Sequence, residues 1–103
     1  MVILSINYFP GKEIEALGMV KGNVVQSKNF GKDFGAGLKS LVGGELKGYT
    51  DMLKEARQVA TDRMVEEANS IGADAVINVR FASSSIMQGA AECIAYGTAV
   101  KFK

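Results

Sequence analysis

Few side chains in this 103-residue sequence could carry chemistry, because it contains no histidine and a single cysteine, Cys93. Histidine is the commonest general base near neutral pH and the commonest transition-metal ligand. Its absence excludes Ser-His-Asp triads, Cys-His pairs and zinc sites of Cys and His within one chain. A lone cysteine cannot form an internal disulfide, so we expect a reducing compartment and a cytoplasmic protein.

Cys93 is the one candidate metal ligand. It could meet its copies around a symmetry axis and bind a soft metal ion. Small residues alternate with it at Ala91, Ala95, Gly97 and Ala99. On such a strand face a thiol more often packs as a small apolar group in the core. We therefore expect neither a metal site nor a cofactor.

The glycine-rich segment Gly31–Ser40 suggests a phosphate-binding loop at first sight. A P-loop requires glycine where Leu38 stands, and a dinucleotide-binding loop requires glycine or alanine where Ser40 stands. Both patterns fail, so we interpret these glycines as serving turns and close packing.

Four polar residues remain as binding or catalytic candidates: Arg80, Glu92, Arg57 and Tyr49. If the last two strands pivot near Ile86, Arg80 and Glu92 lie opposite each other, because they are equally far from the pivot. Such a pair could fix subunit register or line a binding site, and a partly exposed structural ion pair is the alternative. Arg57, beside the apolar stripe of the long helix, could pair with an acid of a neighbouring chain.

The composition is that of one globular domain spanning residues 1–103. Apolar residues make up 48% and charged residues 22% of the chain, and the formal net charge is +1. Nucleic-acid binding usually requires an excess of basic residues, which is missing here. No apolar run approaches the roughly 20 residues of a membrane span. We expect neither nucleic acid nor a membrane as a partner.

Apolar periodicity predicts the elements that position these residues. Alternation predicts strands over 13–27, 73–83 and 90–102. A stripe that recurs every three or four residues predicts a long helix over 49–71 ended by Gly72, and a short helix is expected over about 32–42. One face of the first strand would carry Ile14, Ala16, Gly18, Val20, Gly22 and Val24, and one face of the second Ala75, Ile77, Val79 and Phe81.

These elements imply an α+β fold of two layers, with a β-α-β-β order and a three-stranded, antiparallel-type sheet. One helix covers one face, and the small residues from Ala91 to Ala99 suit its close approach. The other face would expose Ile94, Tyr96, Val100, Phe102, Val76, Leu17 and Met19. Apolar patches of several hundred Å² usually mark interfaces, so we expect self-association. The alternative is a monomer in which the N-terminal residues and the short helix cover this face.

Five segments form a specific set: Leu41-Val42-Gly43-Gly44, Tyr49, Glu55-Ala56-Arg57, Gly72-Ala73-Asp74-Ala75-Val76 and Tyr96-Gly97-Thr98-Ala99-Val100. Together they resemble the YbjQ-like family of small bacterial and archaeal proteins, from about residue 12 to the C-terminus. The resemblance implies a fold similar to the dodecin subunit and a ring-shaped homopentamer. The family is labelled heavy-metal-binding, which one cysteine and no histidine support poorly. It provides no catalytic residues to carry over.

We therefore expect a non-enzymatic oligomeric module that binds a small ligand or metal, or that serves as a scaffold. An enzyme whose site lies at subunit junctions, using Arg80, Glu92, Arg57 or Tyr49, stays open as the alternative, since carboxylates and tyrosines can transfer protons. Binding of nucleic acid by a ring is disfavoured by the charge balance.

Overall fold

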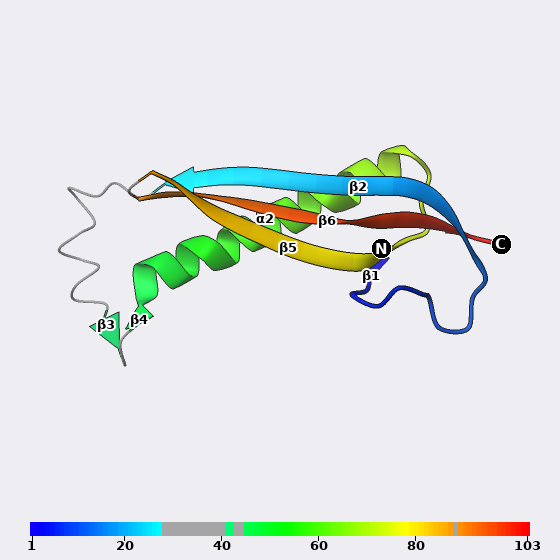
Figure 1. The fold of residues 1–103 in the computed structure, drawn as a ribbon, viewed down its shortest axis with the longest axis horizontal. Coiled ribbons are helices and arrows are strands. Elements are labelled where there is room, and N and C mark those ends of the chain that lie inside the picture. The colour runs from blue at the N-terminus through cyan, green and yellow to red at the C-terminus, as the bar shows by residue number, and fades with distance from the viewer. Residues whose placement is uncertain (28–40, 43–44, 88) are drawn as a thin grey trace.

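The computed structural model describes residues 1–27, 41–42, 45–87 and 89–103. Its elements are β1 (Val2–Ile3), β2 (Ile14–Ser27), β3 (Leu41–Val42), β4 (Glu45–Leu46), α2 (Lys47–Ser70), β5 (Ala75–Met87) and β6 (Ala90–Phe102). A four-stranded sheet has the order β1-β5-β6-β2, and a separate pair joins β3 to β4. Figure 1 shows α2 lying along this sheet, with both chain termini toward the same end of the molecule.

The α+β class, the long helix and the three long strands are confirmed. The predicted three-stranded sheet is wrong, because the sheet has four strands and mixed direction, with β1 parallel to β5. Two residues are too few to show a period, so the sequence pattern missed β1. The short helix expected over about 32–42 lies mostly outside the described residues, and Leu41 and Val42 form a strand instead.

Helix α2 ends at Ser70, and Gly72, which has a φ of 76°, provides the predicted left-handed cap. The Gly72 N–H donates to the Asn69 carbonyl at 3.1 Å, and the Ala73 N–H donates to the Ala68 carbonyl at 3.0 Å. These two bonds form the Schellman motif, whose left-handed position favours glycine. No helix in the described ranges is long and apolar enough to cross a membrane.

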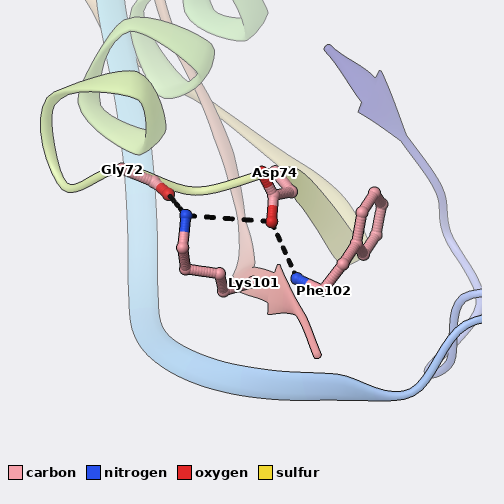
Figure 2. A network of polar contacts seen from close by, with 4 residues as sticks. All are labelled: Gly72, Asp74, Lys101 and Phe102. Carbon is pink, nitrogen blue, oxygen red and sulfur yellow. Dashed lines mark hydrogen bonds and ion pairs between the residues drawn. The ribbon is translucent and has the colours of Figure 1, made fainter.

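A polar network joins the end of α2 to the end of the sheet (Figure 2). Asp74 accepts a hydrogen bond at Oδ2 from the Phe102 N–H at 2.8 Å. Lys101 Nζ donates to the Gly72 carbonyl at 3.1 Å and lies 3.9 Å from Asp74 Oδ2. Because both charged side chains are at least a third exposed, at 54% and 36%, the ion pair adds little stability. The hydrogen bonds to backbone groups are therefore what fixes the end of α2 to the end of β6.

Register shifts interrupt both long strands that flank β6, once in β2 and twice in β5. The register of β2 shifts between Ala16 and Gly18. The register of β5 shifts between Ile77 and Arg80, where Asn78 has a φ of 55°. Asparagine tolerates this left-handed conformation better than most residues. An extra residue in a strand reverses the face that every later side chain occupies.

The bulges make the prediction of uninterrupted alternation wrong. Ile14 and Ile77 belong to a cluster on the face opposite α2. Val20 and Val79, later on the same two strands, pack in the core beneath α2. Phe81 follows Val79 by two positions and therefore also lies on the α2 side.

The core between α2 and the sheet uses the small residues of β6, as predicted. Cys93, Ala95 and Ala99 are all at most 1% exposed. The helix approaches β2 most closely at Gly22, where an added Cβ would overlap backbone atoms of Ala60 and Met64. Glycine at this position is therefore a requirement of the packing.

The segment between β1 and β2 covers part of the face opposite α2. Phe9 packs with Ile14 and Phe102 against the buried Val100. The rings of Phe9 and Phe102 lie 4.8 Å apart. The segment turns at Gly11, which has a φ of 75°. The prediction that Val100 and Phe102 lie on an uncovered face is wrong, because the N-terminal residues pack on them.

Candidate functional site

An open hollow of about 300 Å³ is lined by Lys54, Arg57, Gln58, Thr61 and Phe81. It forms because α2 packs chiefly on β2 and β6 and leaves part of β5 uncovered beside it. The four helical residues share one side of α2, because their spacing of three to four positions matches one helical turn. Phe81 comes from β5 and is 49% exposed.

The polar groups of this hollow are only partly satisfied within the chain. Thr61 Oγ1 donates to the Arg57 carbonyl at 2.7 Å, and Gln58 Nε2 donates to Asp62 Oδ1 at 2.9 Å. The Thr61 hydroxyl and the Gln58 side-chain carbonyl keep lone pairs that can accept hydrogen bonds. Over the described ranges, the side chains of Lys54 and Arg57 form no ion pair or hydrogen bond. The hollow is therefore positively charged, with an aromatic wall.

Sequence reasoning named Arg57 in this hollow and missed its other four residues. Lys54, Gln58 and Thr61 could have been found from their helical spacing to Arg57. Phe81 could not have been found this way, because the Asn78 bulge decides which face of the sheet it occupies.

A second feature is the uncovered part of the sheet face opposite α2. Met19 is 69% exposed, Val25 56% and Tyr96 37%. The predicted exposure of Met19 and Tyr96 is thus confirmed. Val76 is wrongly placed by the prediction, because it packs in the core beneath α2.

Two strand edges beside this face are unpaired in the described part of the chain. β2 is the last strand in the sheet order. β1 and the residues after it, through Ile6, form backbone hydrogen bonds to β5 as far as Val79, so only the part of β5 beyond Val79 forms the other edge. Unpaired edges present backbone donors and acceptors to any strand that approaches.

The predicted cross-strand pair of Arg80 and Glu92 is wrong. Arg80 lies opposite Tyr96, and Glu92 lies opposite Ser84, because the strands stay paired as far as Met87 and Ala90 and the hairpin turns beyond Ile86. Arg80 Nη1 instead donates to the Ser5 carbonyl at 2.7 Å. The guanidinium therefore holds the N-terminal segment against β5.

The four polar candidates are not brought together within one chain. Arg80 and Glu92 are separated by four positions along the hairpin, about 13 Å at 3.3 Å per residue. Tyr49 lies in the first turn of α2, and Arg57 follows it by eight positions, about 12 Å along the helix. Arg57 alone contributes to the hollow.

Cys93 does not fit a metal site. Its thiol is 1% exposed within an apolar cluster that includes Val24 and Ala56. Throughout the described residues, no three His, Cys, Asp or Glu side chains lie close enough to hold an ion. A thiolate without further donors cannot complete the coordination shell of a soft metal. The thiol packs here as a small apolar group.

We expect Cys93→Ala to leave metal uptake unchanged, because the thiol faces the core. Equilibrium dialysis against Zn²⁺ and Cd²⁺, followed by elemental analysis, measures the bound metal per chain. Circular dichroism checks that the variant is folded. A folded Cys93→Ala protein that loses metal bound by the wild type would contradict this interpretation.

The chain has clear relatives along its whole length. The family model YbjQ_1, described as "Putative heavy-metal-binding", matches residues 1–103. A UPF0145 protein of Clostridium novyi is 64% identical over 101 residues, which cover 98% of each chain. A UPF0145 protein of Thermosipho africanus is 60% identical over 104 residues, which cover 100% of this chain and 96% of the relative.

A solved structure supports the fold. The crystal structure of a protein with unknown function from Pediococcus pentosaceus, of the DUF74 family, matches with a TM-score of 0.76 at 11% sequence identity. The match covers 100% of this chain and 98% of that chain. The full-length family match and the relatives at 60% identity or more show that this chain belongs to the YbjQ-like family, which its sequence motifs resemble.

Proposed function

We propose that this protein is a cytoplasmic, non-enzymatic homo-oligomer that binds a small ligand. The uncovered apolar face around Met19, Val25 and Tyr96 is the observation that carries the proposal. Exposed apolar side chains gathered on one sheet face favour an interface, because their burial removes apolar surface from water. A second copy of the same chain is the partner that every cell making this protein supplies.

The shape of the single chain also favours assembly. β2 has 14 residues and β6 has 13, more than twice the roughly 5–6 residues of an average strand. The Cα radius of gyration is 16.8 Å, whereas a compact domain of about 100 residues has roughly 13 Å. Long strands covered by one helix leave much of their surface to be buried by neighbours.

A closed ring would pair both free strand edges of every chain. Within the described residues, each chain offers one free edge at β2 and another along β5 beyond Val79. Head-to-tail contacts between different surfaces generate rings when the rotation closes. The family resemblance implies five copies, and we propose a homopentamer on that basis.

Native mass spectrometry and sedimentation velocity test the assembly at micromolar concentration. We expect an oligomer of five copies, and Met19→Lys is expected to weaken it at least tenfold, because the lysine charge would have to be desolvated at the interface. Ile71→Lys is the matched control, since Ile71 is 47% exposed beyond the end of α2. A wild-type protein that sediments as one compact copy would remove the basis of the proposal.

A further inference from the structure

The positively charged hollow between α2 and β5 has the chemical character of a ligand site. Two cations, Lys54 and Arg57, line it together with two groups that can accept hydrogen bonds and one aromatic ring. Its volume of about 300 Å³ lies at the lower end of small-molecule sites, which span roughly 300–1,000 Å³. The hollow therefore suits a small molecule better than a polymer.

The two cations favour an anion. Exposed lysine and arginine on a helix are commonly neutralised by acids three or four positions away. Lys54 and Arg57 make no such pair over the part of the chain that the structure describes. Among the described residues, the acid that is bonded to a lining residue is Asp62, which accepts a hydrogen bond from Gln58. An anion in the hollow would thus meet two unneutralised positive charges.

The ring of Phe81 adds a second preference. Its side chain is 49% exposed on the wall of the hollow, although phenylalanine usually gains stability by burial. An exposed aromatic face can stack on a flat ring in an offset arrangement. The lone pairs of Thr61 and Gln58 could accept hydrogen bonds from hydroxyl or amino groups of the same ligand.

We propose that this hollow binds a small anion that carries an aromatic ring, with the carboxylate or phosphate at Lys54 and Arg57 and the ring against Phe81. Aromatic carboxylates and nucleoside monophosphates share this chemistry. The inference rests on the ligand-binding half of the proposed function and not on the number of copies in the assembly. Binding of the anionic group and of the aromatic ring requires neither a metal nor Cys93.

Titrations with defined probes test the proposal on the full-length oligomer. The probes are 2-naphthoate, adenosine monophosphate, their neutral counterparts 2-naphthamide and adenosine, and inorganic phosphate alone. Calorimetry measures affinity, and amide chemical shifts locate the site. We expect at least one aromatic anion to bind at least tenfold more tightly than its neutral counterpart and than phosphate, with shifts centred on Thr61 and Phe81. Which of the two anions binds identifies the charged group.

Matched variants separate the roles of charge and ring. Lys54→Gln and Arg57→Gln should each weaken binding of the aromatic anion roughly three- to tenfold, as expected for a partly exposed charged contact. Phe81→Leu, which keeps an apolar side chain but removes the ring, should weaken it by a similar factor. Lys103→Gln removes one exposed positive charge outside the hollow and should leave affinity unchanged.

Several results would overturn the proposal. Equal affinity for neutral and anionic probes, shifts confined to the open face around Met19, or full binding by both Arg57→Gln and Lys54→Gln would each exclude it. If wild type binds no probe and Arg57→Gln dissociates the oligomer, then Arg57 pairs with a neighbouring chain instead. Native mass spectrometry reports the assembly separately, so failure of this site and failure of the oligomer are distinguishable.

Discussion

Gly22→Ala is expected to lower the free energy of unfolding by about 3 kcal/mol or more. The methyl group would overlap the Ala60 carbonyl oxygen and the Met64 backbone nitrogen, and would lie 2.7 Å from the Cβ of Arg63. Backbone atoms of a helix cannot move aside as a flexible side chain can. The helix must therefore lift away from β2, which opens the core along its whole length.

Urea denaturation at fixed protein concentration measures this effect, since the stability of an oligomer depends on concentration. Gly11→Ala is the control for the glycine-to-alanine change. No atom lies within 4 Å of an added Cβ at Gly11, although its φ of +75° makes the substitution strained. We expect a cost of about 1–2 kcal/mol there. Similar losses for the two variants would show that the helix does not pack on Gly22 as described.

Met64→Ala is expected to lower the free energy of unfolding by about 2–5 kcal/mol. Met64 is 0% exposed and is among the largest fully buried side chains of the core. It packs in the cluster that includes Val20, Ala60 and Cys93. Removing three heavy atoms leaves a cavity between two stiff layers, because neither the helix nor the sheet can collapse fully into it.

Met87→Ala provides the matched comparison, because Met87 is 66% exposed near the hairpin turn. Its loss should change stability by no more than about 0.5 kcal/mol. The same urea experiment compares both methionine variants with the wild type. If Met64→Ala were as mild as Met87→Ala, the central position of Met64 in the core would be refuted.

The elements of the fold follow from local properties of the sequence. The apolar stripe of α2 has a helical period, and Gly72 marks its end because glycine easily adopts the left-handed conformation there. The small residues of β6 predicted the face that a helix approaches, since alanine and glycine leave room for its backbone. These predictions depend on neighbours close in the chain, which a single sequence displays directly.

The side of the sheet on which each residue of β2 and β5 lies cannot be read from the local sequence pattern. The shift near Gly18 and the bulge at Asn78 each reverse the alternation, and a bulge is recognised only when the partner strand is known. The prediction of Arg80 opposite Glu92 failed because β5 and β6 stay paired as far as Met87 and Ala90, so the hairpin turns beyond the expected pivot at Ile86. Cover of the far face by the N-terminal residues was an open alternative that the sequence could not decide, because Phe9 meets Phe102 across nearly the full length of the chain.

The sequence by itself determined the fold class, the C-terminal cap of the long helix and the absence of histidine chemistry. Only the tertiary structure decided that Cys93 is enclosed, that Arg80 holds the N-terminal segment and that a charged hollow borders Phe81. The physical reason is that periodicity reports which residues share an element, whereas a site forms where separate elements meet. Strand register and helix placement decide which residues of separate elements come into contact, and both are properties of the packed chain.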